Sequence, residues 1–96
     1  MTGMISMVTV VIMGPLVIDM RSPEPSYQQL ARQLRDRIRA GEYEPGGELP
    51  SIQRMVQETG LAVGTVRHAI ALLAEEGWAY TVPGRGTYVA EKRPDA

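Results

Sequence analysis

The spacing of the apolar residues changes at Gly77, from a helical repeat to a strand repeat. Upstream, between residues 26 and 76, apolar side chains recur every three or four positions, which is typical of helices that bury one face. Downstream, two short β-type runs, 78–82 and 87–89, flank the turn-forming residues 83–86. A chain of 96 residues is large enough for one domain. Several helices followed by a single hairpin are therefore expected to share one core.

Three helices are predicted upstream of the hairpin. The first covers residues 27–40, the second about seven residues after Ser51, and the third residues 64–76. The third helix is expected to bury one stripe, which consists of Val66, Ala69, Ile70 and Leu73. The tight turn 61–63 separates the second and third helices, as in a helix-turn-helix. The predicted fold is mainly α with a small β-hairpin: a winged helix-turn-helix with three helices, a wing and a short N-terminal β-type segment.

Polar residues and glycines mark the predicted helix ends. Ser26 is expected to be the N-cap of the first helix, with Gln29 as its capping-box partner, and Ser51 the N-cap of the second. A glycine follows each helix and supplies a left-handed stop, at Gly41, Gly60 and Gly77.

Residues 1–20 differ in composition from the rest of the chain. They contain five of the six methionines and one charged residue, Asp19. The run 8–13 is too short to span a bilayer, and no Lys or Arg precedes it as in a signal peptide, although export or membrane attachment stays open as the alternative. Strand propensity is high at 8–12 and 17–18, so this segment is predicted to be a strand or a tail.

The chain is accordingly divided into four parts. These are an apolar N-terminal segment (1–20), a linker with two prolines (21–25), the winged helix-turn-helix domain (26–90) and a polar tail (91–96). The run 8–18 is hypothesised to pack across a homodimer interface, because an exposed β-prone run promotes aggregation.

Composition excludes several functional classes. The chain has no cysteine and one histidine, His68, so neither thiol chemistry nor a multi-histidine metal site is available, and we expect no metal and no cofactor. Glu75 and Glu76 are adjacent on a helix and their side chains diverge, and no glycine-rich loop has phosphate-binding spacing. We therefore expect no enzymatic activity. Ten Lys and Arg against eleven Asp and Glu give no overall basic charge, so nucleic-acid binding must depend on local arrangement.

A series of short motifs occupies residues 25–89: Tyr27-Gln28-Gln29-Leu30, Gly41-Glu42-Tyr43-Glu44-Pro45-Gly46, Leu49-Pro50-Ser51, Thr65-Val66-Arg67, Ala69-Ile70, Leu73, Glu76-Gly77 and Gly84-Arg85-Gly86-Thr87-Tyr88-Val89. In this order and spacing they resemble the DNA-binding domain of the GntR family of bacterial transcription regulators. Val17-Ile18-Asp19, followed by Ser22 and Pro25, also resembles the lead-in strand of one branch of that family.

The resemblance implies a cytoplasmic, sequence-specific regulator of transcription that binds double-stranded DNA, most simply as a repressor and a homodimer. The helix at 64–76 would then lie in the major groove and the wing tip at 83–86 on a flanking groove. The candidate DNA-binding residues are Ser51, Gln53, Arg54, Gly64, Thr65, Arg67, His68, Gly84, Arg85 and Gly86.

A structural reading stays open for many of these candidates. Ser51 could serve only as a helix cap, and Gln53 and Arg54 could simply face solvent. His68 could be a partly exposed polar residue, and the arginines, including Arg67 and Arg85, could be solvated. The stripe formed by Arg32, Arg35 and Arg39 is predicted to be a solvated face. Trp78 and Tyr80 are predicted to pack the hairpin onto the helices rather than to stack on single-stranded bases, and Tyr27 is predicted to be core.

The chain departs from the family pattern in two places. Ile52 and Gln53 replace an acidic residue and an arginine, and Ala62 and Val63 replace a Ser or Thr cap and an arginine. Two arginines that often contact the operator are therefore missing. Only seven residues follow Val89, so we expect no ligand-sensing domain and no small-molecule effector for this chain. The alternatives are a winged helix that binds another protein and a fragment of a longer regulator.

Overall fold

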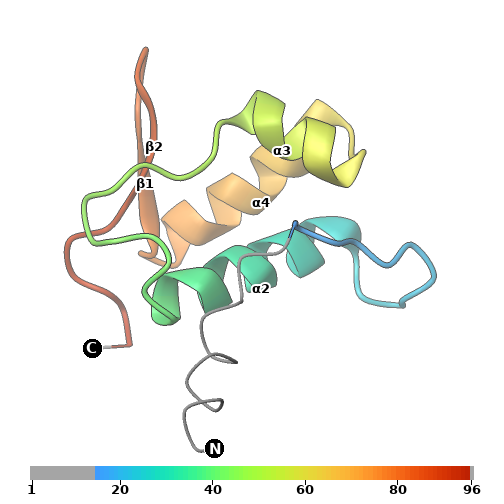
Figure 1. The fold of residues 1–96 in the computed structure, drawn as a ribbon, viewed down its shortest axis with the longest axis horizontal. Coiled ribbons are helices and arrows are strands. Elements are labelled where there is room, and N and C mark those ends of the chain that lie inside the picture. Colours follow the sequence, from blue (N-terminus) through green and yellow to red (C-terminus); the bar gives the residue numbers. More distant parts are fainter. Residues whose placement is uncertain (1–14, 96) are drawn as a thin grey trace, which may run out of the picture.

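The structure, a computed structural model, describes residues 15–95 and consists of three helices followed by a two-stranded antiparallel hairpin. The elements are α2 (Ser26–Arg39), α3 (Ile52–Thr59), α4 (Val63–Glu75), β1 (Ala79–Val82) and β2 (Gly86–Val89). Helix α4 packs against both α2 and α3, and the hairpin rises from its C-terminal end past α3 (Figure 1). The predicted winged helix-turn-helix is confirmed. The strand predicted at 8–12 lies outside the described residues.

One apolar core joins all the elements. Its fully buried members include Leu30 and Leu34 from α2, Met55 from α3, and Val66 and Leu73 from α4. The hairpin adds Ala79 and Val89, and the predicted stripe of α4 is buried throughout.

The loop between α2 and α3 is bonded along the outer strand of the hairpin. Leu49 N–H donates to the Thr87 carbonyl at 2.9 Å, and Val89 N–H donates to the Gly47 carbonyl at 2.8 Å. Buried Leu49 anchors this loop in the core. The loop thereby fixes the hairpin relative to the start of α3.

The ends of α3 follow the sequence prediction, but the start of α2 does not. Ser51 Oγ accepts a hydrogen bond from Arg54 N–H at 3.0 Å, and Gly60 ends the helix with φ = 75°. In α2, however, Ser26 is the first helical residue and Pro25 is the N-cap, with no side-chain cap. The predicted capping box of Ser26 and Gln29 is therefore wrong, because the Gln29 side chain is bonded elsewhere.

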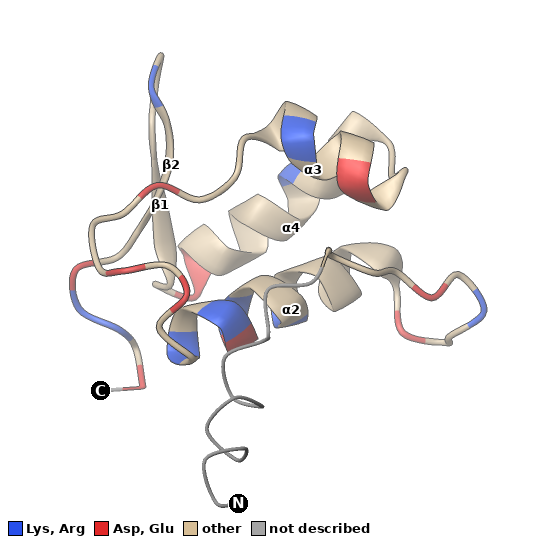
Figure 2. Cartoon of the chain, viewed as in Figure 1, with Lys and Arg blue, Asp and Glu red and all other residues tan. Residues whose placement is uncertain are grey.

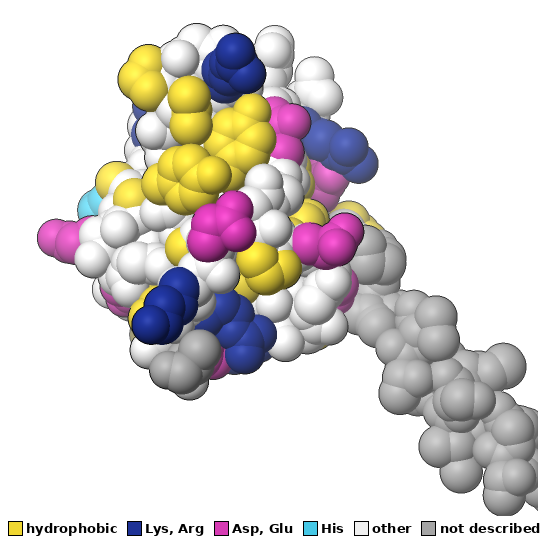
Figure 3. Space-filling view, turned by 90° about the vertical axis from the view of Figure 1, so that its left-hand side faces the viewer, with side chains coloured by type: hydrophobic (Ala, Val, Ile, Leu, Met, Phe, Trp, Pro, Cys, Tyr) yellow, Lys and Arg dark blue, Asp and Glu magenta, His cyan; other side chains and the backbone are white. Residues whose placement is uncertain are grey.

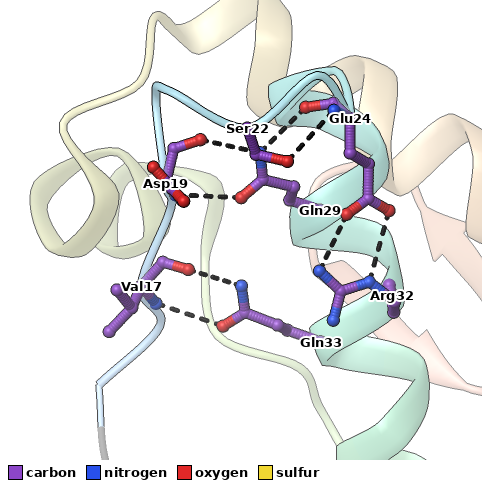
Figure 4. Close-up of polar contacts among 7 residues, drawn as sticks. All are labelled: Val17, Asp19, Ser22, Glu24, Gln29, Arg32 and Gln33. Atoms are coloured by element: carbon purple, nitrogen blue, oxygen red, sulfur yellow. Dashed lines mark hydrogen bonds and ion pairs between the residues drawn. The ribbon is translucent and has the colours of Figure 1, made fainter.

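Two glutamines on α2 hold the segment that precedes the helix (Figure 4). Gln29 is buried: its Oε1 accepts from Asp19 N–H at 2.9 Å, and its Nε2 donates to the carbonyls of Asp19 and Glu24 at 2.9 and 2.8 Å. One turn later, Gln33 makes the same pair of bonds with the N–H and C=O of Val17.

The predicted strand at Val17–Ile18 is not formed, and these two glutamines explain why. Residues 17 and 19 are about 7 Å apart in an extended chain, close to the spacing of side chains at i and i+4 on a helix. Two side-chain amides therefore bond the same edge of the extended backbone that a neighbouring strand would bond. Leu16, at 2% exposure, is drawn into the core by this arrangement.

Replacing Gln29 with alanine is expected to lower the free energy of unfolding by about 1–3 kcal/mol, because partly buried backbone groups of Asp19 and Glu24 lose their partners. Urea unfolding followed by circular dichroism measures the change. Gln28→Ala, at the exposed neighbouring position, is the matched control and should change stability by less than about 0.5 kcal/mol. Equal stabilities for the two variants would contradict the clamp.

An ion pair closes the loop on the other side of Gln29. Arg32 contacts both carboxylate oxygens of Glu24, at 2.8 and 3.2 Å, and these bonds lower the pKa of Glu24 below its usual 4.5. A carboxylate whose pKa is lowered on folding stabilises the folded state above its unfolded pKa. That contribution is lost as the pH falls below 4.5 and through the folded pKa. Arg32→Gln is expected to return the pKa of Glu24 towards 4.5 in an NMR titration, whereas Arg39→Gln should leave it unchanged.

Candidate nucleic-acid interface

The turn between α3 and α4 is fixed by hydrogen bonds and by one buried side chain. Thr59 Oγ1 donates to the Met55 carbonyl at 2.7 Å and accepts from Leu61 N–H at 3.1 Å. Leu61 is 6% exposed and anchors the turn in the core. The relative orientation of α3 and α4 is thus set by the same residues that end α3.

Helix α4 has one buried and one exposed face. The exposed side chains include those of Val63, Arg67, His68 and Ala71, while Thr65 is half-buried at the edge. Gly64 is also exposed, and a Cβ at this position would meet nothing within 4 Å. Three of the predicted site residues, Gly64, Arg67 and His68, are therefore exposed on α4, and Thr65 lies half-buried beside them.

The cations of the described residues divide into two groups. Six contact carboxylates: Arg32, Arg35, Arg37, Arg39, Arg54 and Arg93. Arg67 on α4 and Arg85 at the wing tip form no salt bridge with any residue in 15–95, and the same holds for Arg21 and Lys92. Figure 2 marks Lys and Arg positions in blue on α3, on α4 and at the tip of the hairpin. Two of the candidate cations, one on α4 and one at the wing tip, therefore contact no carboxylate among residues 15–95.

The arginine stripe on α2 is neutralised. Arg35 contacts Glu76 at 3.0 Å, and Arg39 contacts Asp36 and Asp95 at 3.5 and 3.4 Å. Together with the Arg32–Glu24 pair, these contacts agree with the prediction of a solvated face rather than a phosphate-binding one.

The three candidates at the start of α3 have different surroundings. The hydroxyl of Ser51 already accepts a bond as the helix cap. Arg54 is exposed, but its Nε donates to Glu58 Oε2 at 3.1 Å. The carboxylate offsets the charge of the guanidinium and so weakens its attraction for a phosphate. Gln53 is exposed on the first turn. Cap bonding therefore accounts for Ser51, whereas Gln53 points a polar group at solvent.

The wing is a hairpin of two four-residue strands, and its turn, residues 83–85, depends on glycine. Tyr80 pairs with Tyr88 and Val82 with Gly86, and Arg85 N–H donates to the Val82 carbonyl at 2.9 Å. Gly84 has φ = 78° and Gly86 has φ = 142°, conformations that other residues rarely adopt. These two glycines therefore place Arg85 at the exposed tip.

An open groove of about 370 Å³ separates the wing from the start of α3, and its walls include both Ser51 and residues 84–86. The structure thus brings these two predicted parts of the site together. The candidates on α4, Gly64, Thr65, Arg67 and His68, lie on a separate helix, in its N-terminal half.

His68 has a partner that the sequence does not reveal. Its ring stacks on Tyr27 of α2, with centroids 3.7 Å apart and planes 8° apart. Tyr27 is partly buried against the core. The contact supports the reading of His68 as a partly exposed polar residue that helps to join α2 and α4.

The hairpin aromatics do not both pack inward. Trp78 is 5% exposed, and the Arg39 guanidinium lies 5.0 Å from its ring centroid. Tyr80 is 41% exposed and stacks on Tyr88 on the outer face, so the prediction that it covers the helices is wrong. Successive strand residues face opposite sides, and Ala79 takes the inward position in β1. Figure 3 shows hydrophobic side chains gathered over this side of the molecule.

Two other classes of site are absent from residues 15–95. This part of the chain contains no cluster of three or more His, Asp or Glu side chains suited to a metal ion. It also contains no helix with the length and apolar character needed to cross a membrane.

The sequence profile described as "Bacterial regulatory proteins, gntR family" matches residues 26–89. The transcriptional repressor NagR of Bacillus subtilis is 38% identical over 76 residues, which are 79% of this chain and 31% of NagR. The repressor YtrA of the same species is 36% identical over 74 residues, which are 77% of this chain and 57% of YtrA. The chain therefore spans about a third to somewhat over half of these relatives.

Two solved structures have the same fold. YtrA from Sulfolobus acidocaldarius, a GntR-family transcription factor, superposes with a TM-score of 0.75 and 34% identity, over 82% of this chain and 83% of that one. The DNA-binding domain of AraR, in complex with an operator, superposes with a TM-score of 0.73 and 30% identity, over 77% of this chain and 94% of that one.

Proposed function

The chain belongs to the GntR family of bacterial regulatory proteins, and we propose that it binds a specific operator in double-stranded DNA and represses transcription. The family consists of regulators, in agreement with the expectation that the chain is not an enzyme. In this proposal the exposed face of α4 enters the major groove and the wing tip contacts a flanking groove.

The distribution of unpaired cations is the observation that carries the proposal. Affinity for DNA comes largely from neutralised phosphates, and a cation already paired with a carboxylate contributes less. Arg67 and Arg85 lie on the recognition helix and the wing, and neither contacts a carboxylate among the described residues. The match with the operator-bound AraR domain supports the same docking.

We further propose that the chain acts as a homodimer on a two-fold symmetric operator, with half-sites about 34 Å apart or a multiple of it. One module has few unpaired cations, so a second copy would increase the phosphates neutralised. Val17 and Met20 are 66% and 73% exposed; Val17 lies within the apolar run 8–18 that we assign to the interface, and Met20 lies two residues after it. Most of that run lies outside the described residues.

Sedimentation of the full chain and of a version that starts at Pro15 tests the dimer. The truncation keeps Leu16, whose burial makes it part of the core. The full chain is expected to sediment as a dimer and the shortened chain as a monomer. If both chains sedimented as the same oligomer, residues 1–14 would not form the dimer interface.

Selection from random duplexes, followed by affinity measurements over a range of salt concentrations, tests the function. Enrichment of one sequence, with an affinity that falls linearly on a logarithmic scale as salt increases, is the expected result. The alternative, a winged helix that binds another protein, predicts no enrichment over random DNA at low salt.

Arg85→Ala is expected to weaken binding several-fold and by a similar factor on every duplex, because a wing arginine mainly contacts phosphate or the minor groove. The slope of log affinity against log salt should fall by about 1 in magnitude. Lys92→Ala, which also removes a cation without a salt bridge among residues 15–95 but from the C-terminal segment, is the matched control. Fluorescence anisotropy measures both. An unchanged slope in Arg85→Ala would place the wing away from DNA.

A further inference from the structure

The first turn of α4 exposes an apolar side chain where a polar one would be expected. Val63 is the first residue of the helix and is 47% exposed, one of four large hydrophobic residues exposed among the described residues. Its neighbours Ala62 and Gly64 are exposed as well and carry no hydrogen-bonding side chain. The N-terminal tip of α4 is therefore an apolar surface open to solvent.

Folding gives no reason for a valine at this position. The buried stripe of α4 is complete without it, since Val66, Ala69, Ile70 and Leu73 fill the core. A β-branched residue also has a lower helix propensity than alanine or leucine. An exposed valine at the start of a helix contributes little to stability, so a role in contact with another molecule accounts for it better.

The solvent face of α4 is mainly apolar beyond its first turn as well. Residues 63, 67, 71 and 74 recur at spacings of three and four, so they share one side of the helix. All four are exposed, and three of them are Val63, Ala71 and Ala74. Arg67 is the only hydrogen-bonding side chain in this row. A helix with such a face can approach a groove closely and can distinguish bases mainly by apolar contact.

The major groove offers one apolar group that differs between base pairs, the C5-methyl group of thymine. Guanine presents two hydrogen-bond acceptors in the major groove, and a valine would leave both without a partner. Residues at the N-terminus of a recognition helix are those that contact base edges. On the premise of the proposed function, we infer that Val63 is a specificity-determining residue and packs against a thymine methyl group in each half-site.

The spacing of Val63 and Arg67 on α4 predicts where this thymine lies in the half-site. Val63 and Arg67 are one turn apart, about 6 Å, which corresponds to about two base pairs along the duplex. If Arg67 contacts guanine, the half-site contains a thymine about two positions from that guanine.

The test uses a duplex selected from a random library by the full chain. Each thymine of the half-site is replaced in turn by deoxyuridine, which removes the methyl group alone. When it is made in one half-site only, one of these replacements is expected to weaken binding about fourfold, the effect of one buried methyl group. Val63→Ala should weaken binding to the thymine duplex and should be insensitive to that replacement. Gln28→Ala, at an exposed position on α2, should keep the wild-type sensitivity.

The outcomes separate the inference from the function on which it rests. An enriched duplex that binds equally well with deoxyuridine at every position would overturn the role of Val63 and leave operator binding intact. No enriched sequence at all would overturn operator binding, and the role of Val63 with it. A second selection with Val63→Arg should replace the preferred thymine by guanine; an unchanged consensus would also overturn the inference. Alanine favours helix over valine, so a loss of binding in Val63→Ala does not arise from unfolding.

Discussion

Arg67→Ala is expected to weaken binding to the selected operator by about 5- to 150-fold, the range for loss of a bidentate arginine contact with guanine. Arg67 is exposed on α4 and contacts no carboxylate among residues 15–95, so its guanidinium is available to a base or a phosphate. Because the side chain makes no contact of this kind within the fold, the midpoint of thermal unfolding should stay within about 2 °C. Fluorescence anisotropy and circular dichroism measure the two quantities.

Arg35→Ala is the matched control for this prediction. It removes the same charge from a helix surface, but Arg35 is paired with Glu76 and belongs to α2, which lies on the opposite side of the molecule from the wing tip (Figure 1). Its affinity for the operator is expected to change less than twofold at physiological salt, because the Debye length there is about 8 Å. If both variants lost affinity equally, overall charge rather than contact by α4 would govern binding.

The helices could be predicted from the sequence because each has a local signal at both ends. Each predicted range lies within about one residue of its helix, and Gly41, Gly60 and Gly77 have the positive φ expected of helix stops. The apolar stripe of α4 identifies its buried face without knowledge of its partners. Such features depend on neighbours in the chain and are therefore visible in the sequence.

The errors concern contacts between residues distant in the chain. Gln29 has the spacing of a capping-box residue, but its amide is used by the backbone of Asp19 and Glu24. Val17 has strand propensity, yet its hydrogen-bonding partner is a glutamine side chain. Propensity measures the local preference of the backbone and cannot identify the group that satisfies it.

The candidate site was predictable in outline but not in its electrostatics. The sequence identifies Arg54, Arg67 and Arg85 as candidates, with Arg67 the strongest, and the structure shows that of these three only Arg54 contacts a carboxylate among residues 15–95. The i,i+4 spacing of Arg54 and Glu58 could have indicated that pair. No local pattern could have indicated that His68 stacks on Tyr27, because 41 residues separate them.

Leu73→Ala is expected to lower the free energy of unfolding by about 2–5 kcal/mol, the usual cost of a cavity left by a leucine in a closed core. Leu73 is 0% exposed and lies near the C-terminal end of α4, where its carbonyl accepts a bond from Trp78 N–H at 2.9 Å. The free energy of unfolding of a domain of this size is about 4–12 kcal/mol in total, so the variant should lose a large part of its stability. The midpoint of thermal unfolding should fall by at least about 10 °C.

The adjacent leucine supplies the control and connects stability to function. Leu72 is only partly buried, so Leu72→Ala should lower the free energy of unfolding by about 1 kcal/mol or less. At a temperature below both transitions the two variants should bind the operator like the wild type, because neither side chain lies on the exposed face of α4. Between the two transitions only Leu73→Ala should lose binding. Equal unfolding midpoints for the two variants would contradict the assignment of Leu73, rather than Leu72, to the shared core of the helices and the wing.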